Sequence, residues 1–441
     1  MPELSVSTWA IVKLVFSFGL MLLLLRKHRP LWLAICAGSL SVAVLCRMPW
    51  ESALIPFKTA IDLDFLLMLA MLSGILLLSG LQNATGQSRR LVEGLERCIR
   101  WPRVRLVFFP ALVGLLPMPG GAYFSCPMLD NASRGIKMSP QRKSLINYWF
   151  RHIWEGTWPL YPGCALASSL LGISLLTLLK YTLPFALLSF LTGWFFFMRG
   201  ITPADMAEAL AREKERIPSR EASGQALKAV AYESLPLLIT LLGAALFGAA
   251  IQGLAPEAPA QLSFVISVCC GVLTAYVQGR RHLTQSVAGI FFTKTTLRLL
   301  LVIFAVYIFK DIIGASGLIS QMSEVGSNPV MVLLLCAGLA FCAGLLTGVM
   351  VGLVGLCFPI LLGVIAKSGL GDYTIPLAIF AMVCGNAGML LTPVHICLAL
   401  TCEYFKIPLS SIWRSLLPAT GIVFVYGSLW CLLLAFLLVG F

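Results

Sequence analysis

Charged residues are scarce in this sequence. Asp, Glu, Lys and Arg together make up 12% of the 441 residues, whereas 59% of the residues are hydrophobic. A soluble domain of this length needs a charged surface, so this balance excludes an ordinary soluble fold. A membrane-spanning helix requires roughly 20 consecutive apolar residues, and runs of that kind recur along the chain. The composition therefore predicts an all-α polytopic membrane protein, with the lipid bilayer as a partner.

The motifs of common enzyme classes are missing from the sequence. It contains no HExxH, no GxSxG, no phosphate-binding loop and no aspartate pair at the spacing of an intramembrane protease. Its 14 cysteines form no CxxC pair, and they lie mostly in apolar runs, where cysteine packs as a small hydrophobic residue. We therefore expect no enzyme, no metal centre and no cofactor other than Na⁺ or H⁺ as a coupling ion.

The basic residues are distributed unevenly between the apolar runs. Cytoplasmic loops of membrane proteins carry an excess of Lys and Arg, so the basic clusters predict the cytoplasmic side of a prokaryotic inner membrane. This topology places both termini outside and the connector 199–233 in the cytoplasm. It also accounts for the net charge of +13 without nucleic acid as a partner. Six clusters hold 25 of the 32 Lys and Arg residues, at 26–29, 89–105, 134–143, 199–228, 280–298 and 406–414.

The stretch 106–130 lies between two of these cytoplasmic clusters. It must enter and leave the membrane on the same side, which a simple span cannot do. Its middle reads Pro117-Met118-Pro119-Gly120-Gly121, and proline and glycine break a helix. We predict a re-entrant helical hairpin with its tip at 119–122. Irregular backbone at membrane depth is tolerated only where it is buried in protein or lines a wet cavity, so this tip is a candidate binding site.

A similar stretch occurs in the second half of the chain. The run LLTGVMVGLVGLCFPILLG matches Gly352 to Gly121 of the first stretch, at a spacing of 231 residues. Each half also reads as three spans, a hairpin, a broken helix and a span. We predict two inverted repeats with about 11 transmembrane elements. The first repeat is 1–198, with its hairpin at 106–130 and broken helix at 141–179, and the second is 234–441, with its hairpin at 329–363 and broken helix at 371–404.

Charged residues interrupt one apolar span of the first half. The run NYWFRHIWE places Arg151, His152 and Glu155 in a segment that has to cross the membrane. Charges in lipid are costly, so such residues face a cavity or pair with one another. Arg151 and Glu155 are four residues apart, which would allow an ion pair on one face of a helix. The alternative is a binding or proton-relay site in which His152 titrates.

The residues that follow are expected to unwind this helix. Pro159 and Pro162 donate no backbone hydrogen bond. Freed carbonyl groups suit cations, while the start of the next half-helix presents amide groups to an anion. The second half offers Asn386, Thr392 and His395 at matching positions. His395 is either a second proton carrier or a structural hydrogen-bond donor.

Three runs carry a resemblance to a known family. MPGGAYFSCP, NYWFRHIWEGTWPLYPG and LTPVHICLALTCEYF resemble an uncharacterised prokaryotic membrane family, the domain of unknown function 401. That family is grouped with the ion transporter superfamily, which includes carriers for dicarboxylates, citrate, gluconate and arsenite, and sodium/proton antiporters. The resemblance implies two hairpins and two broken helices that meet at a central substrate site. It also implies elevator-type movement with sodium or proton coupling.

The sequence departs from this superfamily at the hairpin tips. The sodium-coupled dicarboxylate carriers have Ser-Asn-Thr motifs at both tips, whereas this sequence has PGGA and GLVG there. Sodium would have to bind backbone carbonyl groups, helped by Asn147, Asn386 or Thr392. We therefore favour proton coupling through the two histidines or Glu155.

The expected function is secondary active transport of a small solute, an organic anion, coupled to protons or sodium. The alternative is a cation/proton antiporter, and a membrane-embedded enzyme or a scaffold is less favoured. A homodimer is left open. The candidate substrate- and ion-binding residues are Pro119, Gly120, Gly121, Asn147, Arg151, His152, Glu155, Gly352, Asn386, Thr392, Pro393 and His395.

Overall fold

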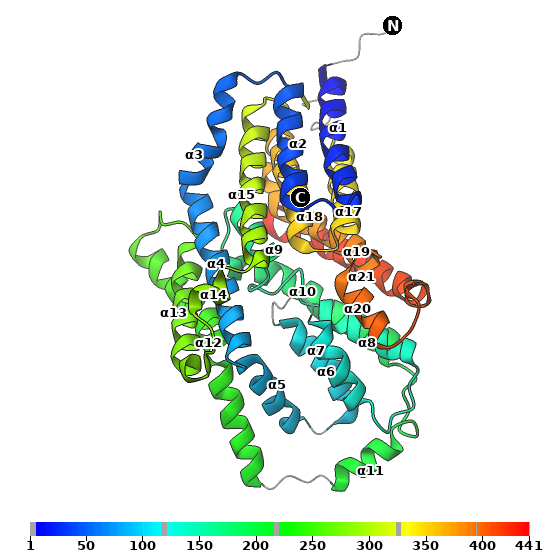
Figure 1. Cartoon of the computed structure of the whole chain (residues 1–441). Helices are drawn as coiled ribbons and strands as arrows, with labels where there is room; N and C mark the ends of the chain where they lie inside the picture. The colour runs from blue at the N-terminus through cyan, green and yellow to red at the C-terminus, as the bar shows by residue number, and fades with distance from the viewer. Residues whose placement is uncertain are drawn as a thin grey trace.

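A computed structural model of the chain describes residues 6–99, 101–115, 121–215, 220–322, 328–393 and 395–440. Within these ranges every regular element is a helix (Figure 1). Nine helical segments in the described ranges are long and apolar enough to cross a membrane, and α2 (Leu31–Leu45) is a shorter apolar helix. The structure therefore confirms the prediction of an all-helical, multi-pass membrane protein.

One set of helices, here called the outer group, is defined by its packing. Its members pack mainly with one another: α2 contacts α15, α13 contacts α4, and α12 contacts both α13 and α5. The group consists of α1 (Val6–Arg26), α2, α3 (Ile55–Ile61), α4 (Leu63–Ala84), α5 (Gln87–Cys98), α12 (Arg220–Leu254), α13 (Leu262–Gly279), α14 (Val287–Phe291) and α15 (Lys294–Ala315).

The remaining α-helices except α11 form a second set, the central group, which contains the most deeply buried apolar segments. In α18, 72% of the apolar window is buried, against 17% in α12 of the outer group. The group consists of α6 (Pro102–Leu115), α7 (Ala122–Ala132), α8 (Pro140–His152), α9 (Pro162–Leu170), α10 (Leu175–Gly193), α17 (Pro329–Thr347), α18 (Met350–Lys367), α19 (Thr374–Leu391), α20 (Ile396–Tyr404) and α21 (Leu409–Val439). Helix α11 (Ala207–Glu215) lies in the connector between the halves, at one end of the molecule (Figure 1).

Helices α6 and α7 occupy the position of the first predicted hairpin and pack against each other. They have 14 and 11 residues, so at 1.5 Å per residue they are about 21 and 17 Å long, shorter than a hydrocarbon core of about 30 Å. The predicted tip residues Pro119 and Gly120 lie outside the described residues. Gly121 is the residue that precedes the first turn of α7.

The second predicted hairpin corresponds to α17 and α18, which also pack against each other. The turn between them lies at Gly348 and Val349, four residues before the predicted tip. Gly348 has a φ of 63°, which glycine adopts without steric strain. Gly352 instead lies in the first turn of α18, where a Cβ atom would come within 2.7 Å of the Thr347 side chain. Its role there is close packing rather than a turn.

Both predicted helix breaks are present, but the second is shorter than expected. The first runs from 153 to 161, between α8 and α9; the second covers only 392–395, between α19 and α20. Asn386, which matches the first break in position, is helical within α19, as are the neighbouring Gly385 and Gly388. The glycines allow close helix packing: a Cβ atom on Gly388 would collide with the carbonyl oxygen of Phe341 in α17.

Candidate functional site

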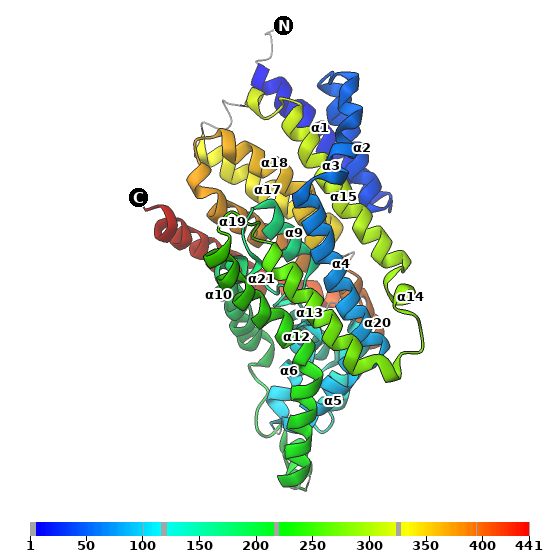
Figure 2. The same ribbon diagram turned by 90° about the vertical axis from the view of Figure 1, so that its left-hand side faces the viewer.

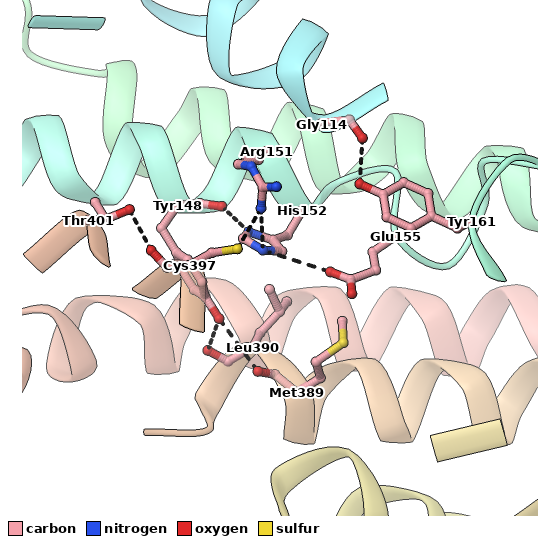
Figure 3. Close-up of polar contacts among 10 residues, drawn as sticks. All are labelled: Gly114, Tyr148, Arg151, His152, Glu155, Tyr161, Met389, Leu390, Cys397 and Thr401. Carbon is pink, nitrogen blue, oxygen red and sulfur yellow. Dashed lines mark hydrogen bonds and ion pairs between the residues drawn. The ribbon is translucent and has the colours of Figure 1, made fainter. Parts of the chain in front are cut away.

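Four helix ends meet where the two breaks face each other. Helix α8 begins at a Ser139 cap, whose hydroxyl accepts a hydrogen bond from the Arg142 amide, and Pro140 occupies its first turn. It ends at His152, just before the segment that contains Gly156 and Pro159. The side chains of Tyr148, Arg151 and His152 in α8 point towards the start of α20 and the end of α19 (Figure 3). The polar residues of the first half therefore face the second half.

Arg151 lies at the centre of this site. Its side chain is buried, with the residue 5% exposed. One guanidinium nitrogen, Nη1, donates a hydrogen bond to the Cys397 sulfur at 2.7 Å and lies 3.4 Å from Nε2 of His152. A Cβ atom on Gly121 would come within 2.5 Å of the same guanidinium group. Glycine at 121 therefore leaves the space that the arginine fills, and two predicted site residues lie together.

The His152 side chain is positioned by the backbone carbonyl of Tyr148 and by two aromatic rings. Its Nδ1 atom lies 2.5 Å from the Tyr148 carbonyl oxygen, so this nitrogen carries the proton and donates. Its ring contacts the rings of Tyr148 and His395, each at a centroid distance of 4.5 Å. The other nitrogen, Nε2, lies 3.8 Å from the Glu155 carboxylate. His152 therefore stands between the arginine and the glutamate.

Glu155 lies in the first break and connects the two halves. Because α8 ends at His152, Arg151 and Glu155 do not share a face of one continuous helix. The Glu155 carboxylate accepts a hydrogen bond from the backbone N–H of Met350, the first residue of α18. Glu155 is 8% exposed. A carboxylate from the first half thus occupies the amide end of a second-half helix, where the helix dipole favours negative charge.

Asn147 joins three helices on the other side of Arg151. Its Nδ2 group donates to the Thr401 hydroxyl at 3.0 Å, in α20, and to the Cys126 sulfur at 3.2 Å, in α7. It is fully buried, and its Oδ1 atom has no hydrogen-bond partner among the described residues. This oxygen is an unsatisfied acceptor in the interior.

The second-half candidates occupy three different positions. His395 is the cap residue of α20, and its buried Nδ1 atom has no hydrogen-bond partner in the described part of the chain. Thr392 donates its hydroxyl to the Leu345 carbonyl oxygen, and Pro393 is exposed beside it. Asn386 is buried inside α19, and its Oδ1 atom has no hydrogen-bond partner among the residues described. Of this set, His395 is the residue that contacts His152 of the central site.

Several residues of the site were not among the predicted ones. Tyr148 donates its hydroxyl to the Leu390 carbonyl oxygen at 3.1 Å, and Tyr161 donates to the Gly114 carbonyl oxygen at 2.5 Å. Cys397 contacts Arg151, as described above. A sequence signal for Cys397 exists: it lies two residues after His395, so both fall at the start of the same short helix.

One group of side chains has the composition of a metal site. The potential ligand atoms of His152, His395 and Cys397 lie within 4.8 Å of one another. Imidazole and thiolate ligands suit zinc and other late transition metals. The Arg151 guanidinium, however, contacts the nitrogen of one and the sulfur of another. A metal ion would have to displace this positive charge.

The region just described matches a protein-family model. A family model described as a protein of unknown function, DUF401, matches residues 8–209 and 261–434. The matched ranges include both breaks, both helix pairs α6–α7 and α17–α18, and all the side chains around Arg151. No curated protein matches the chain.

Proposed function

Since the chain belongs to this family of proteins of unknown function, DUF401, we propose its function from the site: secondary active transport of a small organic anion, coupled to protons or sodium. The observation that carries the proposal is the buried Arg151 guanidinium between two helix breaks. An ionised side chain inside a bundle of membrane helices is costly and marks a substrate or ion pathway. The guanidinium contacts the Cys397 sulfur and the His152 ring, and in this proposal its positive charge also attracts the bound anion.

Helix ends add to the positive potential of this site. Helices α9, α18 and α20 begin at Pro162, Met350 and Ile396, close to the two breaks. The free amide groups and dipole at the start of a helix favour anions. A carboxylate or similar group that binds Arg151 would therefore also gain from these helix ends. Transporters use broken helices at the membrane midplane in this way.

Two hydrogen bonds support the proposed internal repeat. Tyr161 in the first break donates to Gly114 at the end of α6, and Thr392 in the second break donates to Leu345 at the end of α17. Donor and acceptor are 47 residues apart in both pairs, and both donors and acceptors are offset by 231 residues (392 minus 161, 345 minus 114). Helices α4 and α15 share this offset and have 22 residues each. If the basic clusters mark the cytoplasmic side, the two halves cross the membrane in opposite orientations.

The two sets of helices suit an elevator-type mechanism. In this proposal the central group, with its hairpins and broken helices, moves against the outer group and carries the solute across. Both termini are outside, the connector 199–233 is cytoplasmic, and the protein lies in a prokaryotic inner membrane. The lipid bilayer and the solute are the partners, and a homodimer would hold the outer groups fixed.

Glu155 provides a route for proton coupling. When Glu155 is ionised, its carboxylate accepts the hydrogen bond from the Met350 N–H, so this N–H cannot bind a solute anion. Protonation removes its charge and weakens this hydrogen bond, so the amide becomes available when a proton binds. The proton and the solute anion therefore bind together. The titratable and charged groups around Glu155 are Tyr148, Arg151, His152, Tyr161, Cys164 and Cys397.

Sodium is the other coupling ion that the site supports. Asn147 and Asn386 each bury an Oδ1 atom that has no partner among the described residues. Amide and carbonyl oxygens are suitable ligands for a hard cation. Sodium binding at either oxygen would couple transport without a change in the protonation of Glu155.

Cation/proton antiport is the second candidate function. The observation in its favour is the trio His152, His395 and Cys397, whose ligand atoms could bind a soft metal cation. Glu155 would then carry the counter-transported proton. In this mechanism Arg151 acts as a tethered cation that fills the site when no metal is bound.

Reconstituted vesicles with an internal pH dye distinguish these functions. We expect an inward solute gradient to drive proton uptake for at least one member of a panel of organic anions. Proton release on addition of Na⁺, K⁺ or Zn²⁺, without any organic solute, would instead establish antiport. A panel that changes neither the dye signal nor the accumulation of labelled solute, with or without sodium, would rule out the proposed transport.

Labelling of single cysteines tests the re-entrant hairpin. In a background in which the exposed cysteines Cys98, Cys269 and Cys342 are replaced by serine, we expect Trp101→Cys, before α6, and Arg134→Cys, after α7, to react with an impermeant maleimide from the same side. The reason is that α6 and α7 are each too short to span the bilayer. Reaction from opposite sides of right-side-out and inverted vesicles would disprove the hairpin and the topology built on it.

A further inference from the structure

A polar cavity of about 380 Å³ lies in the outer group, apart from the central site. It is formed where α5, α12 and the end of α13 meet, three helices that lie together in Figure 2. A short 3₁₀ turn, Arg280–His282, follows α13 and forms part of the wall. The residues that matter here are Arg90, Glu233, Val277, Gln278, Arg280 and Arg281.

The inner wall of the cavity is fixed by an ion pair. Arg90 binds the Glu233 carboxylate through two nitrogens, Nε at 2.5 Å and Nη2 at 3.2 Å. Its third nitrogen, Nη1, donates to the Thr85 carbonyl oxygen at 2.8 Å. The Glu233 side chain is 8% exposed. The charges of this pair cancel, and a bidentate geometry of this kind is rigid.

A second set of hydrogen bonds fixes the neighbouring wall. Gln278 of α13 accepts from the Gln87 side chain of α5 at 3.1 Å and donates to the Tyr232 carbonyl oxygen of α12 at 3.0 Å. Three helices from different parts of the chain are therefore held in place around the cavity before any ligand binds. A preorganised wall reduces the entropic penalty of binding.

Two arginines at the rim have no counter-charge. Arg280 and Arg281 are exposed, and neither makes a hydrogen bond or ion pair with the residues that the structure describes. The only acidic side chain among the described lining residues is Glu233, which is paired with Arg90. The cavity thus has two uncompensated guanidinium groups. Guanidinium groups bind phosphate oxygens in a bidentate manner.

The surroundings of the cavity indicate where such a phosphate comes from. The apolar span that contains α13 ends at His282, so the cavity lies at the boundary between its lipid-facing surface and water. Val277, at the cavity wall, is 53% exposed, and Leu273, one helical turn before it in α13, is 63% exposed. Acyl chains can cover these side chains while the headgroup enters the cavity. Basic pockets between membrane helices bind anionic headgroups in this way.

We propose that this cavity binds the phosphate of an anionic phospholipid, with Arg280 and Arg281 as the phosphate ligands. The bound lipid bridges α5, α12 and α13 and thereby stabilises the outer group. The site does not depend on the transported solute. It lies at the end of α13 that the basic clusters place in the cytoplasm.

The test uses the full-length protein purified in detergent and native mass spectrometry with phosphatidylglycerol or phosphatidylcholine. We expect retention of phosphatidylglycerol and not of phosphatidylcholine. An Arg280→Gln/Arg281→Gln variant should bind phosphatidylglycerol about 30-fold more weakly. Each arginine near an anionic headgroup contributes about 1 kcal/mol of binding free energy, and the loss of two such contributions corresponds to this factor. Lys294→Gln/Arg298→Gln removes two exposed charges from α15 and is the matched control, with unchanged binding expected.

The control variant and a competition experiment with inorganic phosphate can each contradict the proposal. Equal losses in both double variants would show that general positive charge on the cytoplasmic side attracts the lipid, and would overturn the site. Displacement of phosphatidylglycerol by excess inorganic phosphate would show that the cavity binds free phosphate instead of a lipid. If the double variant does not elute as a folded protein, Arg281→Gln alone serves, with an expected loss about half as large on a logarithmic scale.

Discussion

A Glu155→Gln variant is expected to lose proton-coupled solute uptake by about 100-fold while it folds normally. Glutamine has nearly the same shape and can still accept the Met350 hydrogen bond, so the packing around the first break is kept. Glutamine cannot bind or release a proton, however, so its hydrogen bond to the Met350 N–H does not change with pH. Solute-driven proton uptake should fall to the level of vesicles without protein, while exchange of labelled for unlabelled solute continues.

Glu403→Gln is the matched control for this substitution. Glu403 is an exposed carboxylate near the end of α20, so we expect its replacement to leave uptake unchanged. Retention of full proton-coupled uptake by Glu155→Gln would remove Glu155 from the coupling mechanism. Sodium coupling through the buried asparagine oxygens would then be favoured, and uptake should depend on the sodium gradient.

Replacement of Arg151 by Gln should have the larger effect on solute binding. Loss of one partner from a buried charge pair costs about 2–5 kcal/mol, which corresponds to a loss of affinity of about 30- to 4,000-fold. Arg151→Lys keeps the charge but not the planar geometry, so an intermediate loss is expected. Binding is measured by scintillation proximity with the labelled solute identified in vesicles. Arg89→Gln is the control, because that side chain is 81% exposed.

The same variant separates anion transport from metal antiport. The guanidinium contacts atoms of His152 and Cys397, two of the three potential metal ligands. If the site is built for a metal cation, removal of the Arg151 guanidinium should strengthen Zn²⁺ binding, as measured by isothermal titration calorimetry. If the site is built for an anion, solute binding is lost and no Zn²⁺ binding is gained. Stronger Zn²⁺ binding with unchanged solute uptake would contradict the anion proposal.

The sequence predicted the parts of the fold that depend on local chemistry. Apolar runs predicted the membrane helices, and the prolines at 159 and 162 predicted the first break, which the structure places at 153–161. Arg151, His152 and Glu155 were chosen as candidates because charges are rare in apolar spans. These signals are local, so a single sequence is enough to read them.

The parts that could not be predicted depend on contacts between distant residues. Cys397 contacts Arg151 across 246 positions, and Tyr148 reaches Leu390 across 242. Nothing in either segment alone indicates its partner. The glycines beside Asn386 in α19 could favour either unwinding or close helix packing. What decides between the two is the neighbouring backbone of α17, which the sequence does not show.

The division into two groups of helices also sets a geometric limit on any movement between them. The chain passes between the groups at residues 99–101, 199–219 and 316–328. The shortest connection joins Cys98 to Pro102 and has four Cα–Cα steps, which span about 14 Å when fully extended. The facing ends of α5 and α6 can therefore never separate further than this tether allows. A long stroke of the central group has to pivot about that point, with the largest displacement at the far end of the molecule.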